Sequence, residues 1–259
     1  MKLPRIFERR HVIMTLEMAR AEFKLKDQGS FLGFLWTMLH PLIYFFVLYS
    51  LFDKWMGAHI DNFALYLIIG IVQWNFFVNA TSNAINSVMR QGNYVRNIKF
   101  PNDVLVVASV FAVLYSHFFE LLILVVFWLL LGRAVSIYAL FLFTILILNI
   151  YLALAMGFIL ATLGVFFLDI NRIWQILASV GLFLTPIFYS LDMLAPEKRA
   201  IILINPMTHI IIATRSVLID MTMPDPAGLF YVLILSTVLM AIGYLIFKHY
   251  EGYFAEKIC

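Results

Sequence analysis

Long apolar runs separated by short polar connections are the main pattern of this chain, and they are typical of helices that cross a lipid bilayer. A spanning helix needs about 20 apolar residues, because the hydrocarbon core is about 30 Å thick and each residue rises about 1.5 Å. This rule predicts six spans, over residues 31–51, 63 to about 83, 104–131, 135–168, 173–191 and 229–247. We therefore expect an all-α integral membrane protein with six transmembrane helices.

The composition agrees with this interpretation. Of the 259 residues, 63% are hydrophobic and 13% are charged, whereas soluble domains are about half apolar and about a quarter charged. The net charge of +3 does not indicate nucleic-acid binding, because the Lys and Arg residues gather near the ends of the predicted spans. The single cysteine, Cys259, excludes a disulfide within the chain.

The first 30 residues carry seven Lys or Arg and four Asp or Glu, with no apolar core of a signal peptide. Their apolar positions, such as Phe7, Val12, Leu16 and Phe23, follow a roughly helical spacing. We expect an amphipathic helix in the cytoplasmic interface, with an ordinary solvated helix as the alternative. The chain then forms one domain, residues 1–259, made of this helix (1–30) and a six-span bundle (31–259).

Charge predicts the orientation. With six spans both termini lie on the same side, and 13 of the 18 Lys and Arg residues fall on that side. Because cytoplasmic loops carry the excess of positive charge, both termini are predicted to be cytoplasmic.

The second predicted span is unusually polar in its second half. Polar groups in lipid must find partners, so this half should face protein or water. The residues concerned are Gln73, Asn75, Asn79, Thr81, Ser82 and Asn83.

Residues 201–219 are apolar and long enough to span, but they contain Asn205, Pro206, His209 and Arg215. Pro206 removes a helical hydrogen bond and disfavours a helical Asn205. Arg215 at membrane depth would cost about 2.5–3.5 kcal/mol on insertion scales. We therefore favour two short helices that re-enter from the outer side, between the fifth and sixth spans, over a seventh span.

His117 and Glu120 lie one turn apart near the middle of the third span. An intramembrane carboxylate is a candidate for a proton relay or a substrate contact. The alternative is a hydrogen bond that fixes helix packing, and at this stage it is the preferred interpretation.

The chain lacks the phosphate-binding loop G-x-x-x-x-G-K-[ST] and the zinc motif H-E-x-x-H. It is therefore predicted not to be an enzyme, to have no ATPase site and to bind no cofactor or metal itself. Aromatic residues of the first and fifth spans could stack on sugar rings, although most such rings simply face lipid; they are Trp36, Phe45, Tyr49, Phe183, Phe188 and Tyr189.

Several segments together resemble the membrane (permease) subunit of type-2 ABC exporters of polysaccharide, the group that exports O-antigen, capsule and teichoic acid. The resemblance covers nearly the whole chain and keeps the order of the motifs. They are Ser30, Leu32, Gly33, Trp36 and Pro41 at the first span, YVRNIKFPNDVL (94–105), VFFLDINRI (165–173), LTPIFYS (184–190), INPMTHII (204–211) and FKHYEGYFAEKI (247–258). The family's Arg-Tyr-Lys/Arg cluster is replaced here by Lys26, Asp27 and Gln28.

The resemblance implies a homodimer in the bacterial inner membrane that associates with two copies of a separate P-loop ATPase, on which ATP and magnesium bind. It also implies a lipid-linked polysaccharide as substrate and a path lined by the six aromatic residues above. Asn205, Pro206 and His209 become a re-entrant gate. The cytoplasmic loop becomes the ATPase-docking loop, with Arg90, Tyr94, Arg96, Lys99, Phe100 and Pro101 as candidate contacts.

We therefore expect export of an undecaprenyl-linked polysaccharide, foremost O-antigen. One alternative is the permease of an ABC exporter for a drug or small lipid. Another is a proton-coupled secondary carrier that uses His117 and Glu120, and a third is a membrane scaffold without transport.

Overall fold

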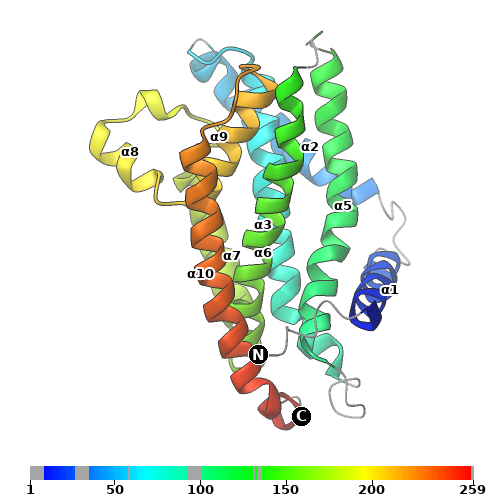
Figure 1. The fold of residues 1–259 in the computed structure, drawn as a ribbon. Coiled ribbons are helices and arrows are strands. Elements are labelled where there is room, and N and C mark those ends of the chain that lie inside the picture. Colours follow the sequence, from blue (N-terminus) through cyan, green and yellow to red (C-terminus); the bar gives the residue numbers. More distant parts are fainter. Residues whose placement is uncertain are drawn as a thin grey trace.

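The computed structural model describes residues 9–26, 35–57, 59–92, 101–130, 132 and 136–257, and within these ranges all regular elements are helices (Figure 1). This confirms the predicted all-α membrane fold. The longer helices are α1 (Arg9–Lys26), α2 (Leu35–Met56), α3 (Phe63–Arg90), α5 (Asp103–Leu130), α6 (Phe141–Phe166), α7 (Ile170–Leu184), α9 (Pro206–Leu218) and α10 (Pro226–Tyr250). The short ones are η2 (Ile137–Leu140), η3 (Leu191–Met193), α8 (Pro196–Ile202), η4 (Glu251–Tyr253) and α11 (Phe254–Lys257).

Five helical segments are long and apolar enough to cross a membrane: Leu35–Met56, Phe63–Arg90, Asp103–Leu130, Ile137–Phe166 and Pro226–Lys257. The pair α8 and α9 makes a sixth candidate if it is counted as one span, but it is bent by 99°. The predicted break in residues 201–219 is therefore present.

The fifth predicted span, 173–191, is shorter than expected. It corresponds to α7, whose 15 residues reach only about 22 Å. The helix ends because Pro186 disfavours a helical conformation at the residue before it, and Thr185 is extended with φ −102° and ψ 138°.

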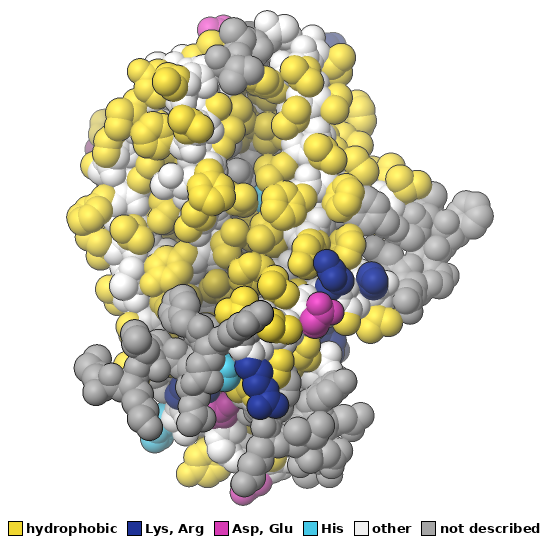
Figure 2. Space-filling view, turned by 45° about the vertical axis from the view of Figure 1, so that its right-hand side comes forward, with side chains coloured by type: hydrophobic (Ala, Val, Ile, Leu, Met, Phe, Trp, Pro, Cys, Tyr) yellow, Lys and Arg dark blue, Asp and Glu magenta, His cyan; other side chains and the backbone are white. Residues whose placement is uncertain are grey.

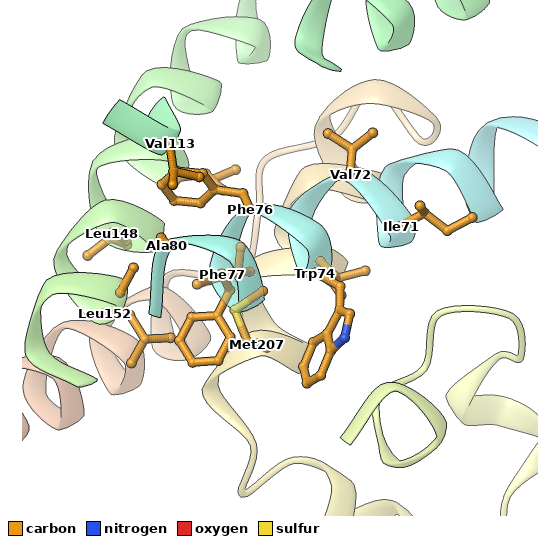
Figure 3. Packing of buried hydrophobic residues seen from close by; sticks show 14 of the residues in the cluster. Ile71, Val72, Trp74, Phe76, Phe77, Ala80, Val113, Leu148, Leu152 and Met207 are labelled. Atoms are coloured by element: carbon orange, nitrogen blue, oxygen red, sulfur yellow. The ribbon is translucent and has the colours of Figure 1, made fainter. Parts of the chain in front are cut away.

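Helix α3 is the centre of the bundle. Its most apolar window is 72% buried, against 17% for α2 and α10. Figure 3 shows part of this core, in which Val113 of α5, Leu152 of α6 and Met207 of α9 surround aromatic side chains of α3. This helix is therefore enclosed by protein over most of its apolar part.

Small residues let α6 approach α3 closely. A Cβ added to Gly157 would lie 3.1 Å from the Ala84 Cβ, and one added to Gly164 would lie 2.7 Å from the backbone oxygen of Ile85. Because a backbone atom cannot move aside, glycine is required at position 164.

Helix α1 packs beside α5 in the same half of the molecule as the C-terminal end of α10, whereas α8 lies toward the opposite end (Figure 1). Ala19 of α1 packs against Ala108 and Ala112 of α5, and the Phe23 ring lies 5.7 Å from that of Tyr115. Figure 2 shows an apolar face whose Lys and Arg side chains gather mainly in its lower half, on the side of α1. The interfacial position of α1 stays a prediction.

A hydrogen bond joins α7 to α3, from the Trp174 Nε1 to the Thr81 Oγ1 at 2.9 Å. Replacing Thr81 by Val should lower the free energy of unfolding by about 1 kcal/mol, because the indole N–H loses its acceptor. Thermal unfolding in detergent measures this, and in a Trp174→Phe background the same change should cost less. Equal costs in both backgrounds would show that the bond contributes nothing.

Candidate functional site

Five polar residues of α3, spaced three or four positions apart on one face of the helix, line a cavity of about 680 Å³ between α1, α3, α5 and α7. Of the polar residues predicted for this span, Asn79, Ser82 and Asn83 line the cavity, whereas Gln73 and Thr81 bond side chains of other helices. The polar lining of the cavity consists of Asn79, Ser82, Asn83, Asn86 and Arg90 of α3, Asn171 and Gln175 of α7, and Glu22 and Lys26 of α1, together with Gln91.

Six of these ten polar residues carry an amide side chain, which both donates and accepts hydrogen bonds, and apolar residues such as Met18, Leu25 and Val113 complete the wall. One of the amides, Asn171, has a buried Oδ1 without a hydrogen-bond partner in the described part of the chain. Such polar groups suit a neutral, hydroxyl-rich ligand, whereas an apolar ligand would leave the amides without partners. Among the described residues no group of three or more His, Cys, Asp or Glu side chains could hold a metal ion.

Glu22 of α1 joins this helix to the end of α3. Its Oε1 accepts hydrogen bonds from the Arg90 Nη2 and, at 3.1 Å, from the Asn83 Nδ2. Asn83 completes the junction, because its Oδ1 accepts from Arg90 at 2.8 Å and its Nδ2 donates to the Ser109 oxygen of α5 at 2.9 Å. Arg90, predicted as a docking contact, is thus engaged within the chain, where it links α1 to the start of the loop.

A second ion network holds the other end of that loop. Lys248 of α10 lies 3.3 Å from the buried Asp103 Oδ2 and 2.8 Å from the Glu251 Oε2. The backbone N–H of Asn102 donates to the Glu251 Oε1 at 3.2 Å. Pro101 directly precedes this network, so the loop is clamped to α1 at one end and to α10 at the other.

Four of the predicted docking residues, Tyr94, Arg96, Lys99 and Phe100, lie outside the described residues. The same holds for Ser30, Leu32 and Gly33 of the entry motif and for Asp27 and Gln28 beside it.

His117 and Glu120 contact each other, with the His117 Nδ1 2.9 Å from the Glu120 Oε2. Both are buried, at 0% and 4% exposure, and the His117 ring lies 4.5 Å from that of Phe76. The His117 Nε2 has no partner among the described residues. The pair contributes to packing of α5 against α3, and Glu120 also lines a second, smaller cavity.

At the break between α8 and α9, three backbone carbonyls each receive a side-chain donor, and the Ile202 oxygen also accepts from the Asn205 N–H at 3.1 Å. Thr208 donates to the Ile202 oxygen at 3.0 Å, and the His209 Nε2 lies 2.8 Å from the Leu203 oxygen. The Tyr231 hydroxyl of α10 donates to the Ile204 oxygen at 2.6 Å. An interrupted helix can therefore lie within an apolar region, because its backbone groups are satisfied by protein.

The other predicted gate residues act at the same break. Asn205 is the N-cap of α9: its Oδ1 accepts from the Met207 N–H at 3.0 Å, and its Nδ2 donates to the Thr185 Oγ1 at 2.8 Å. Pro206 occupies the first position of α9, where a missing N–H costs nothing. Asn205, Pro206 and His209 thus stabilise the bend and join it to the end of α7.

Arg215 of α9 is buried and donates four hydrogen bonds to backbone oxygens. Its Nη1 donates to the Pro186 oxygen at 2.6 Å, its Nη2 to the Ile187 oxygen at 2.9 Å, and both its Nε and its Nη2 to the Tyr66 oxygen, at 3.2 and 3.0 Å. The guanidinium carbon lies 3.3 Å from the centroid of the Tyr66 ring. The sequence analysis considered only the free-energy cost of inserting this arginine into the membrane. A lone Arg close to a Pro-interrupted segment could also have indicated a donor for free backbone carbonyls.

Sequence reasoning also missed a buried chain of hydrogen bonds through the core. The Asn149 Nδ2 of α6 donates to the Gln73 Oε1 of α3 at 2.7 Å, and the Gln73 Nε2 donates to the Thr214 Oγ1 of α9 at 3.3 Å. Helix α9 of the bent pair is therefore joined to both α3 and α6.

The six candidate path-lining aromatics occupy different environments. Trp36 and Phe183 are exposed, at 50% and 62%, whereas Phe45 is 3% exposed and packs against Phe127 with ring centroids 5.0 Å apart. Phe45 thus contributes to the core of this chain. Phe188 stacks on Phe52 at 5.0 Å and contacts both Phe183 and Tyr189, while Tyr49 stacks on Phe45. Exposed aromatic area therefore remains at Trp36 and around Phe183.

Comparison with curated proteins gives full-length similarity at low identity. The chain is 26% identical to the "O-antigen export system permease protein RfbA" of Myxococcus xanthus over 95% of both chains. It is 25% identical to the protein of that name from Klebsiella pneumoniae over 91% of both chains. Identity to the "Polysialic acid transport protein KpsM" of Escherichia coli is 23%, over 86% of this chain and 88% of the relative.

A family-level comparison covers the segment in which the site lies. The family described as "ABC-2 type transporter" matches residues 15–219, which include α1 from Thr15 onward, the polar face of α3, the clamped loop and the bent helix pair. Because this match extends over most of the sequence, the chain belongs to the ABC-2 type transporter family.

Proposed function

We propose that this chain is the membrane subunit of an ATP-driven exporter that moves an undecaprenyl-linked polysaccharide, O-antigen foremost, across the bacterial inner membrane. The observation that carries the proposal is the amide-lined cavity inside an otherwise apolar bundle. The two kinds of relative compared above are named for O-antigen export and for polysialic acid transport, and both cargoes are polysaccharides.

ATP hydrolysis belongs to a partner subunit, because the sequence contains no phosphate-binding loop. Two copies of a P-loop ATPase, which bind ATP and magnesium, would dock on the loop that includes Tyr94, Arg96, Lys99, Phe100 and Pro101. Its clamps supply a route for coupling: Glu22 and Arg90 connect it to α1, and Asp103, Lys248 and Glu251 connect it to α10. Movement of the loop would displace both helices together.

Two copies of the chain would enclose the path, with both termini cytoplasmic. The amide-lined cavity lies beside α1, toward the loop, and the bent pair with Asn205, Pro206 and His209 lies toward the opposite end (Figure 1). A polysaccharide would thus meet hydrogen-bonding amides on entry and pass the re-entrant gate on exit. Trp36 and Phe183 offer exposed rings along this route.

The alternatives fit the lining less well. A drug or small lipid would gain little from a row of amides, whose hydrogen bonds it could not replace. A proton-coupled carrier is supported by the buried pair of His117 and Glu120. Such a carrier would transport without any ATPase and would be inactivated by Glu120→Gln.

Affinity purification from native membranes tests the proposal, with identification of the co-purifying chains and an assay of surface polysaccharide in a deletion strain. We expect a P-loop ATPase in about equal amount and loss of the surface polysaccharide. The double change Arg96→Glu and Lys99→Glu should remove the ATPase while the chain stays in the membrane. The matched control, Lys54→Glu with Lys198→Glu, should keep it. A clean homo-oligomer without ATPase would support the secondary carrier instead.

A further inference from the structure

A second cavity, of about 210 Å³, lies between α1, α2, α3 and α5. It adjoins the amide-lined cavity, because Lys26, Asn79 and Val113 line both. Its volume is below the about 300–1,000 Å³ of sites for drug-sized ligands. It therefore suits a single small ring that arrives from the larger cavity.

The floor of this cavity contains polar groups whose hydrogen-bonding capacity is incompletely used. Ser116 is 3% exposed, and its Oγ has no partner in the described part of the chain. Glu120, one turn further along α5, is 4% exposed and bonds His117 through its Oε2. A buried hydroxyl without a partner costs about 1–3 kcal/mol, so a ligand that bonds it recovers that cost.

The mouth of the cavity carries an aromatic surface and further donors. Trp36 of α2 is 50% exposed and lines the cavity together with Thr37 and His40. Lys26 of α1 adds an ammonium group. The lining thus combines one acid, basic groups, two hydroxyls and an indole face, which fits a ring with hydroxyls at its edge and C–H groups on its faces.

We propose that this cavity is a subsite for one sugar unit of the transported polysaccharide. Glu120 accepts hydrogen bonds from two neighbouring hydroxyls of the sugar, Ser116 bonds a third oxygen, and Trp36 covers one face of the ring. His117 positions the Glu120 carboxylate from the protein side. The inference rests on the proposed function, since it names a contact for the cargo of the same transporter.

The test uses the purified complex of this chain with its ATPase and, as probe, the lipid-free oligosaccharide released by mild acid from the polysaccharide of the same strain. Saturation-transfer NMR titration measures its apparent affinity. We expect binding to the wild type, about fivefold weaker binding for Ser116→Ala and about tenfold weaker binding for Trp36→Ala. The control Trp55→Ala changes an indole at the other end of α2, 74% exposed, and should bind like the wild type.

Each outcome decides one question. Wild-type affinity in both Ser116→Ala and Trp36→Ala overturns the subsite, and so does the absence of saturation transfer to the wild type. Loss of binding together with ATPase or thermal stability would indicate a folding defect and overturn it as well. The proposed function is judged separately, by the surface polysaccharide of the deletion strain. If the surface polysaccharide persists in that strain, the proposed function is wrong. If it is lost while Ser116→Ala and Trp36→Ala bind the oligosaccharide like the wild type, only the subsite is wrong.

Discussion

Replacing Arg215 by Ala should abolish export and lower the free energy of unfolding by about 3 kcal/mol. The guanidinium group is the donor for the carbonyls of Tyr66, Pro186 and Ile187, and Arg215 is only 5% exposed. Hydrogen bonds from a charged group contribute about 1.5–3 kcal/mol each, and buried carbonyls that lose their donor keep the cost of leaving water. Thermal unfolding in detergent and the amount of surface polysaccharide measure the two effects.

Two further variants separate geometry from charge. Arg215→Lys keeps the charge but replaces the planar group by a single ammonium, which cannot reach all three carbonyls and loses the stacking on Tyr66. It should recover only part of the stability. Arg199→Ala of α8 is the matched control, because its side chain is 40% exposed and its partner Asp192 is 89% exposed. Equal stability of Arg215→Ala and Arg199→Ala would contradict the anchoring role.

The expected loss of export follows from what Arg215 joins. Its carbonyl partners belong to α3 and to the segment after α7, so the re-entrant helix α9 is fixed to two other parts of the bundle. Gly70 makes room for this contact, since an added Cβ would lie 3.0 Å from the Arg215 Nη2 and 3.2 Å from the Ile187 Cα. Without the anchor, the bent pair would keep its local bonds at Asn205 and His209 but lose its position relative to α3.

The apolar runs predicted the long spanning helices well, because length and hydrophobicity alone identify such helices. The break at Asn205 and Pro206 was also predictable, because proline chemistry acts on the adjacent residue. The same reasoning applied to Pro186 would have ended the fifth span near Leu184, where α7 ends. That span was drawn too long because hydrophobicity continues past the point at which the backbone can remain helical.

The partners of polar residues were not predictable, because they are far apart in the sequence. From the sequence, Arg90 was predicted to be a charged residue of the cytoplasmic loop, but in the fold it bonds Glu22, which lies 68 positions away. The acceptors of Arg215 are backbone carbonyls, which carry no sequence signal, and Tyr66 lies 149 positions away. The sequence did predict that the polar half of α3 faces protein or water, since polar groups in lipid must find partners.

Reversing the charge at either side of the junction between α1 and α3, by Glu22→Arg or Arg90→Glu, should uncouple ATP hydrolysis from export. Each single change places two like charges where Glu22 and Arg90 now meet, so α1 would separate from the end of α3. The effect on stability should be small, within about 1 kcal/mol, because the side chains are 20% and 45% exposed. Surface polysaccharide and the ATPase activity of the purified complex measure the coupling.

The double variant, Glu22→Arg with Arg90→Glu, should restore export to most of the wild-type level. The third member of the junction permits this, because the Asn83 amide donates to Glu22 and accepts from Arg90, and a turned amide can bond the reversed pair. The turn removes the bond from Asn83 to the Ser109 oxygen, so recovery should be incomplete. Glu17 and Arg20 form an exposed pair 3.9 Å apart on α1 and supply the matched control. Charge reversal at either residue or at both should leave export and ATPase activity unchanged. Wild-type export in both single variants would mean that the loop transmits movement through α10 alone, by way of Asp103 and Lys248.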